Sequence, residues 1–209
     1  MKLILLGPPA AGKGTQAEGI AERYSLAHIS TGDMLRAEIA LKTTLGLQAK
    51  ALIDDGNLVP DEIINEMVKE RIRQEDCKGG FLLDGYPRTL AQAETLSQIT
   101  NIDAVLDIDV EPEVLVTRAA KRRVCPECKH TQLVDGVTDA VCAKCGAKLI
   151  QRPDDNPEAM RHRLAIYYER TFPLIRYYKA KGILKAIDGS GTIEKVSSEI
   201  FEFIDGKLS

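Results

Sequence analysis

The sequence predicts an α/β protein in which helices cover both faces of a five-stranded parallel sheet, a three-layer α/β/α arrangement. Short apolar runs alternate with amphipathic helical patterns, and strands buried on both faces have this continuous apolar character. With 209 residues, the chain can form one sizeable core and one or two small insertions. The runs expected to form the sheet are Leu3–Leu6, Ala27–Ile29, Phe81–Leu83, Ala104–Ile108 and Ile183–Ile187.

Composition and charge restrict the classes of function. Hydrophobic residues make up 44% and charged residues 28% of the chain, which is the balance of a folded globular protein. The net charge of -3 argues against a general nucleic-acid binder, so phosphate contacts must come from local groups of arginine and lysine. The N-terminal apolar run is too short for a signal peptide or a membrane span. We expect a cytoplasmic protein with no membrane or nucleic-acid partner.

The turn after the first apolar run has the composition of a phosphate-binding loop, or P-loop. Residues Gly7–Thr15 read GPPAAGKGT. Glycine allows a tight turn whose N–H groups point at an anion, and the start of the next helix adds donors. Lys13 can then reach the outer phosphates of a nucleotide. The strict pattern has Ser or Thr directly after Lys, whereas here Gly14 precedes Thr15, so an ordinary strand-to-helix turn is the alternative.

The second strand is followed by polar residues that face the same crevice in a parallel sheet. In Ser30–Asp33 a hydroxyl could contact a ligand, or Ser30 or Thr31 could simply cap the next helix. Arg36 follows one turn into that helix. Residues 30–59 contain helical patterns and no strand, which predicts a small helical insertion before a new helix begins at Pro60.

The third strand ends in Asp84, and Arg88 and Gln92 follow at intervals of four residues. A carboxylate at this position in a protein with a P-loop is a candidate for holding Mg²⁺, and a turn cap is the alternative. Gln92 lies one turn into the next predicted helix, where its amide could read the edge of a base. Each of these residues alone is weak evidence for a nucleotide site, and together with the predicted phosphate loop they are stronger evidence.

Three stretches resemble the signatures of adenylate kinases: Gly7–Thr15, Ser30–Arg36, and Asp84–Thr89 with Gln92. The similarity continues through the arginines near residue 120 and through Arg152–Asn156, so it covers essentially the whole chain. The family commonly has the displaced hydroxyl too, although Ala10 stands where it usually has glycine, and the loop could therefore differ there. The resemblance implies reversible phosphoryl transfer from MgATP to AMP, giving two ADP.

The resemblance also implies a division of the chain and the roles of individual residues. Residues 1–29, 60–120 and 156–209 would form the core, residues 30–59 an insertion binding the nucleoside monophosphate, and residues 121–155 a small β-rich lid over ATP. The catalytic residues would be Lys13, Arg36, Asp84, Arg88, Arg122, Arg152 and Arg163. ATP would contact Ala10, Ala11, Gly12, Lys13, Gly14, Thr15, Arg118, Arg122, Thr131, Gln132 and Gly191. AMP would contact Thr31, Arg36, Asn57, Leu58, Val59, Gly85, Tyr86, Pro87, Arg88, Gln92, Arg152 and Arg163.

Arginines concentrate in two segments that flank the predicted lid. Their number in an acidic chain indicates a shared polyanion, and a solvated basic helix end is the alternative. We expect Asp154 and Asp155 to pair with these arginines as the lid closes, although Asp155 could also lie in a solvated turn. The arginines are Arg118, Arg122, Arg152, Arg161, Arg163 and Arg170.

Four of the five cysteines form two Cys-x-x-Cys pairs, Cys125 with Cys128 and Cys142 with Cys145. Four thiolates complete a tetrahedral shell with no open position, which predicts a structural metal. Zinc is the default, iron or cobalt is compatible with thiolates, and redox-active or disulfide pairs are the alternative. Cys77 is interpreted as a spare thiol. The histidines show no catalytic arrangement and are interpreted as structural or surface residues.

Three other functions are compared with this prediction. A kinase for another nucleoside monophosphate would share most motifs, but Thr89-x-x-Gln92 resembles the adenylate branch. A GTPase would need an Asn-Lys-x-Asp motif, which the chain lacks. A nucleic-acid-binding zinc ribbon would need aromatic residues for stacking, and residues 125–145 contain no Phe, Tyr or Trp. We expect a monomer.

Overall fold

The computed structural model describes residues 1–136 and 140–208, so residues 137–139 of the predicted lid lie outside the described part. At its centre is a parallel sheet with strand order β2-β3-β1-β4-β7. The predicted five-stranded parallel sheet is confirmed, although its last strand begins one residue later than expected. The strands are β1 (Lys2–Leu6), β2 (Ala27–Ser30), β3 (Phe81–Asp84), β4 (Ala104–Asp109) and β7 (Leu184–Asp188).

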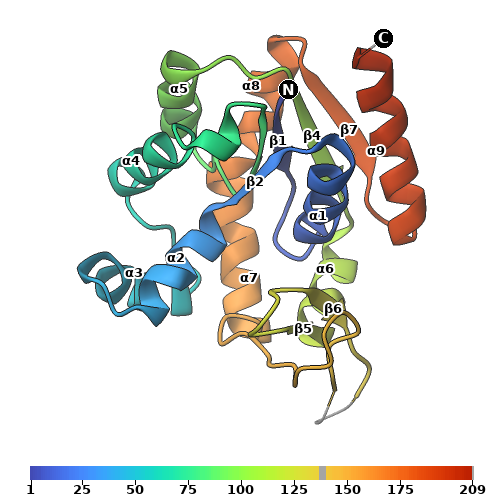
Figure 1. Ribbon diagram of the computed structural model, residues 1–209. Helices are drawn as coiled ribbons and strands as arrows, with labels where there is room; N and C mark the ends of the chain where they lie inside the picture. Colours follow the sequence, from blue (N-terminus) through green and yellow to red (C-terminus); the bar gives the residue numbers. More distant parts are fainter. Residues whose placement is uncertain (137–139, 209) are drawn as a thin grey trace.

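Helices cover both faces of this sheet, as the apolar strands predict. Successive strand residues point to opposite faces, so Leu3 and Leu5 join one buried cluster while Ile4 and Leu6 join the other. The first cluster includes side chains of α1 (Lys13–Tyr24) and α9 (Ile193–Leu208). The second includes side chains of α4 (Asp61–Arg71), α5 (Leu90–Ile99) and α8 (Pro173–Ala180). Figure 1 shows these two groups of helices on opposite sides of the strands.

Helix starts coincide with caps and prolines in the sequence. The hydroxyl of Ser30 accepts a hydrogen bond from the backbone N–H of Asp33 at 3.3 Å and caps α2 (Thr31–Ala40). Asn156 caps α7 (Pro157–Ile166), whose first residue is proline, and α6 (Pro112–Lys121) also begins with proline. These local signals fix where each chain segment turns back toward the sheet.

Two insertions extend from the same end of the sheet (Figure 1). One consists of α2 and α3 (Thr44–Asp54) and contains no strand, as predicted for the segment before Pro60. These helices pack so closely that a Cβ at Gly46 would lie 2.1 Å from the carbonyl oxygen of Glu38. The other insertion, among its described residues, contains the antiparallel strands β5 (Arg122–Val124) and β6 (Thr131–Leu133) and two isolated bridges.

A long helical segment leads from the second insertion back to the core. It consists of α7, a π-helical turn η2 (Tyr167–Thr171) and α8, while a short 3₁₀ turn η1 (Glu75–Cys77) precedes β3. Among the described helices, none combines the length with the apolar character needed to cross a membrane.

Candidate active site

The loop between β1 and α1 closes tightly at the carboxyl end of the central strand. Gly7 has φ +138°, and a Cβ there would lie 2.5 Å from the carbonyl oxygen of Ile108, so only glycine fits. Gly12 has φ +97° and caps α1. Ala10 also adopts a left-handed backbone, with φ +66°. The alanine therefore occupies a conformation in which glycine would be less strained.

The ammonium group of Lys13 lies over this loop. Its Nζ donates hydrogen bonds to the carbonyl oxygens of Gly7 and Pro8, both at 2.8 Å. Burial lowers the pKa of Lys13 to about 8, and this shift is opposed by Asp84 and enhanced by Arg88 and Arg163. An anion bound in the loop would replace the missing solvation of the ammonium group, which makes Lys13 a ready phosphate ligand.

Asp84 ends β3 and faces the loop. Although burial alone would raise the pKa of its carboxyl group, neighbouring His28 and Lys13 hold the pKa below its usual value. The Nε2 atom of His28 lies 3.7 Å from Oδ2 of Asp84 and has no hydrogen-bond partner among the described residues. A buried carboxylate next to a phosphate loop fits the oxygen ligands that Mg²⁺ prefers.

One cleft of about 590 Å³ lies between the helical insertion and the sheet. The hydroxyl of Thr31 donates to the carbonyl oxygen of Gly85 at 2.8 Å, and Arg36 pairs with Asp33 at 2.6 Å. The lining of this cleft combines apolar side chains with a few cationic and hydrogen-bonding groups, which suits a nucleotide. Most residues predicted to contact AMP line it: Thr31, Arg36, Asn57, Leu58, Val59, Gly85, Arg88, Gln92 and Arg163.

A second cleft of about 540 Å³ adjoins the first and is lined by part of the phosphate loop. Gly7 and Lys13 line it, and so does Pro87. Arg88 and Arg163 line both clefts. Ligands in the two clefts would therefore meet at the same pair of guanidinium groups.

Arg88 is held at three points. Its backbone N–H donates to Oε1 of Gln92 at 2.7 Å, and its carbonyl oxygen accepts from the hydroxyl of Thr171 at 2.9 Å. Its Nε donates to the carbonyl oxygen of Gly85 at 2.7 Å. Burial, together with the nearby Arg163, lowers the pKa of Arg88 to about 10. The guanidinium is thus fixed in place in an environment that favours the arrival of an anion.

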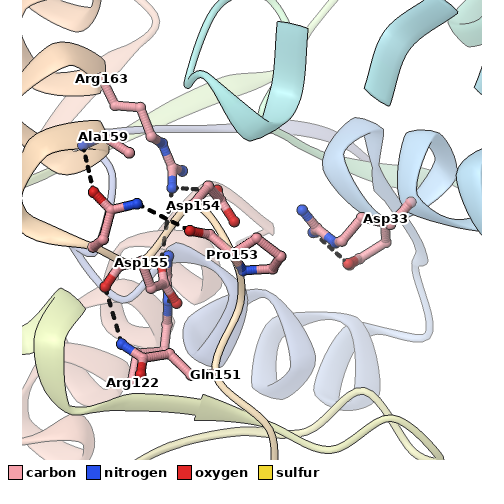
Figure 2. A network of polar contacts seen from close by, with 10 residues as sticks. Asp33, Arg122, Gln151, Pro153, Asp154, Asp155, Ala159 and Arg163 are labelled. Carbon is pink, nitrogen blue, oxygen red and sulfur yellow. Dashed lines mark hydrogen bonds and ion pairs between the residues drawn. The ribbon is translucent and has the colours of Figure 1, made fainter. Parts of the chain in front are cut away.

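The segment that returns from the second insertion places two carboxylates among the arginines (Figure 2). Arg122 forms a two-pronged pair with Asp155, and Arg163 donates to Asp154 at 2.6 Å. Asp155 is only 1% exposed, so the solvated turn is excluded for this residue. Burial, together with Arg36 and Arg122, lowers the pKa of Arg152 to about 10. Its Nε is buried and has no hydrogen-bond partner in the part of the chain that the structure describes.

Other predicted site residues lie outside these two clefts. Tyr86 is fully buried, and its hydroxyl donates to Oδ1 of Asn65 at 2.7 Å. Arg118 donates to the carbonyl oxygen of Gly189 at 3.0 Å, which brings it near the segment containing Gly191. Arg161 and Arg170 are exposed, contrary to the expectation that they join the cluster. The remaining predicted residues that line neither cleft are Ala10, Ala11, Gly12, Gly14, Thr15, Asp84, Arg122, Arg152, Thr131 and Gln132.

The four paired cysteines form one compact cluster, with all their Sγ atoms within 4.8 Å of one another. The Sγ atoms of Cys125 and Cys145 are 3.4 Å apart, and those of Cys128 and Cys142 are 3.6 Å apart. A tetrahedral ion with bonds of about 2.3 Å requires sulfur separations of roughly 3.8 Å, so the set fits a metal. The backbone N–H of Cys128 helps to lower the pKa of the Cys125 thiol to about 7.

Two contributors to the cleft had no recognisable signal in the sequence. Asp61, the first residue of α4, accepts hydrogen bonds from Gln92 and Thr89. Thr171 reaches Arg88 from a distance of 83 residues along the chain. His28, for which the sequence predicts only a structural role, lies against Asp84.

Comparison with known proteins agrees with this geometry. A family model described as adenylate kinase matches residues 5–183. The chain is 50% identical to an adenylate kinase of Clostridium tetani over 216 aligned positions, which cover 100% of this chain and 98% of the relative. It is 48% identical to an adenylate kinase of Geobacillus sp. strain WCH70, with 99% of both chains covered. The chain therefore belongs to the adenylate kinase family.

Proposed function

We propose that the chain transfers a phosphoryl group reversibly from MgATP to AMP and so produces two ADP. The observation that carries this proposal is the pair of adjoining clefts that share Arg88 and Arg163. One cleft adjoins the helical insertion, and Gly7 and Lys13 of the phosphate loop line the other. Two nucleotides bound in them would have their phosphates end to end at the shared guanidinium groups.

The residues assigned to the transferred phosphoryl group are cations. Lys13, Arg36, Arg88 and Arg163 line the clefts, and Arg122 and Arg152 would turn toward the same phosphates from the hinge. The second pKa of a phosphomonoester is near 6, so AMP is already a dianionic nucleophile at pH 7. No general base is needed, and the protein contributes alignment and charge neutralisation.

Water must be kept away from the transferred group, because it competes with AMP as an acceptor. We assign residues 30–59 as the insertion that closes over AMP and residues 121–155 as the lid that closes over ATP. Both extend from the same end of the sheet (Figure 1), and residues that follow β1 and β3, such as Gly7 and Gly85, line the clefts. Arg118, Thr131, Gln132 and Gly191 are assigned to the ATP side, which they would reach on closure.

Two metals are part of the proposal. Asp84, with Lys13 nearby, would orient Mg²⁺ bound to ATP, and that ion supplies neutralising positive charge on the phosphates when bound. The four clustered cysteines would hold Zn²⁺, which completes a closed tetrahedral shell and has a structural role. A single chain provides both clefts, so we expect it to act as a monomer, which light scattering can test.

A ³¹P NMR time course with ATP, AMP and Mg²⁺ tests the reaction directly. We expect both nucleotides to disappear as ADP resonances grow, and an Arg88→Ala variant to lose nearly all transfer while its far-UV circular dichroism stays unchanged. Rates with CMP, UMP and GMP in place of AMP test the acceptor class. Absence of AMP-dependent ADP formation in the wild type would refute the proposal.

A further inference from the structure

The side-chain amide of Gln92 is held on both sides within the cleft assigned to the monophosphate. Its Oε1 accepts the backbone N–H of Arg88 at 2.7 Å, and its Nε2 donates to Oδ1 of Asp61 at 2.6 Å. Gln92 is only 2% exposed and lines the cleft. This buried amide is the polar group best placed to meet a base there, so whatever fixes its orientation matters for recognition.

The two partners admit only one orientation of the amide. A backbone N–H can only donate, so it must face the amide oxygen. A carboxylate can only accept, so it must face the amide nitrogen. Rotating the amide by 180° would place two donors together at Arg88 and two acceptors together at Asp61. The assignment therefore follows from the chemistry of the neighbours rather than from the similar shapes of the oxygen and nitrogen ends.

Asp61 is itself fixed in position. Its second carboxylate oxygen accepts a hydrogen bond from the hydroxyl of Thr89 at 2.7 Å, and that hydroxyl also accepts from the backbone N–H of Gln92 at 3.1 Å. Asp61 is the first residue of α4, where the helix dipole favours a negative charge. The closed ring of contacts through Asp61, Thr89 and Gln92 prevents the amide from turning.

The fixed amide has one oxygen lone pair and one N–H remaining. Adenine presents an amino donor beside a ring-nitrogen acceptor, which is the complement of this pair. Hypoxanthine and guanine have a carbonyl oxygen in place of the amino group, so it would meet the amide oxygen as a second acceptor. We propose that Asp61 is a specificity-determining residue, which fixes the Gln92 amide so that the cleft accepts a 6-aminopurine and rejects a 6-oxopurine. This inference rests on the proposed function.

The test compares AMP with inosine monophosphate, which has a carbonyl group at C6 in place of the amino group. We expect Asp61→Ala to lower the ratio of kcat/KM for AMP to that for inosine monophosphate by about 10-fold, chiefly through a higher KM for AMP. Calorimetric binding of the two monophosphates should show the same change in the ratio of Kd values. Glu62→Ala is the matched control, because it removes an exposed acid from the same helix turn and should leave the ratio within about 2-fold.

The results distinguish a failure of the proposed role of Asp61 from a failure of the proposed function. An unchanged ratio in Asp61→Ala, or an equal fall in both variants, would overturn the role of Asp61 while leaving the kinase assignment intact. A wild-type protein without AMP-dependent transfer would instead refute the proposed function. If Asp61→Ala does not fold, Asp61→Ser allows the same comparison, because serine suits a helix start but is too short to reach the amide.

Discussion

Replacing Lys13 by methionine should change the pH dependence of folding stability in a defined direction. Burial lowers the pKa of Lys13 from 10.5 to about 8 in the folded protein. Between these values the folded state binds fewer protons than the unfolded state, so the free energy of unfolding rises with pH. The stability that depends on Lys13 is fully present above pH 10.5 and is lost as the pH falls toward 8.

The magnitude follows from the size of this shift. The difference between 10.5 and about 8 is about 2.5 pH units, which at 1.36 kcal/mol per unit gives roughly 3.4 kcal/mol as an upper limit. Lys13 is partly exposed, and screening by water reduces the effect, so we expect about 1–3 kcal/mol. Methionine does not titrate. The stability of Lys13→Met relative to wild type should therefore be higher at pH 7 than at pH 10.5 by this amount.

Urea denaturation of the nucleotide-free proteins, followed by circular dichroism between pH 7 and pH 10.5, measures this difference. Lys78→Met replaces an exposed lysine directly after η1 and serves as the control for losing a surface cation. In a coupled assay Lys13→Met should lose nearly all transfer, because the ammonium group is the assigned phosphate ligand. We expect the stability of Lys13→Met relative to wild type to fall from pH 7 to pH 10.5. A relative stability that is constant with pH, or that rises toward pH 10.5, would refute the argument from burial.

Three further changes have expected outcomes. Ala10→Gly should raise the free energy of unfolding by about 0.5–1 kcal/mol in urea titrations. The strain that glycine relieves at the left-handed position exceeds the stability lost through the greater conformational entropy of the unfolded chain. A loss of stability would contradict this. Asp155→Ala should lower the free energy of unfolding by about 3–5 kcal/mol, because Arg122, whose side chain is only 12% exposed, loses its carboxylate partner. A change below about 1 kcal/mol would show the pair to be dispensable. Removal of the metal from the cysteine cluster should lower Tm in calorimetry, because the described residues of the predicted lid bury few apolar side chains. An unchanged Tm after elemental analysis has verified metal loss would argue against a structural ion.

The features that the sequence predicts well are those encoded locally. Continuous apolar runs identify the five strands, and proline or a capping residue marks most helix starts. The strand predicted from Ile183 begins at Leu184, because the N–H of Ile183 still bonds to the carbonyl oxygen of Tyr178 in the turn after α8. The spacing of the four cysteines is also local information, and the structure brings all four sulfur atoms together.

The arginines show why composition alone is insufficient. Arg161 and Arg163 are two residues apart on a helix and therefore point to different sides, so only Arg163 reaches the clefts. Arg170 is seven residues beyond Arg163 and would share its side in a regular helix. The π-helical turn η2 shifts the rotation between them, so that Thr171 lines the second cleft and Arg170 pairs with Glu169 at the surface.

Contacts between distant segments are the part that no local pattern predicts. The burial of Asp155 depends on Arg122, which lies 33 residues earlier, and the position of Asp61 matters only because α5 brings Gln92 to it. Charged residues in a sequence are exposed by default. A carboxylate becomes a buried partner only when the fold supplies a cation or an amide, and the sequence does not state which.

The concentration of buried cations in and beside the clefts relates these contacts to nucleotide binding. Burial lowers the pKa values of Lys13, Arg88 and Arg152, and neighbouring cations lower them further, so the cations are held together against their own repulsion. Asp154 and Asp155 offset part of this positive charge in the segment that returns from the second insertion. Phosphates are the anions that would neutralise the rest, so a bound nucleotide should stabilise this arrangement of cations. The concentrated positive charge of the clefts is thus the physical reason to expect that they bind nucleotides.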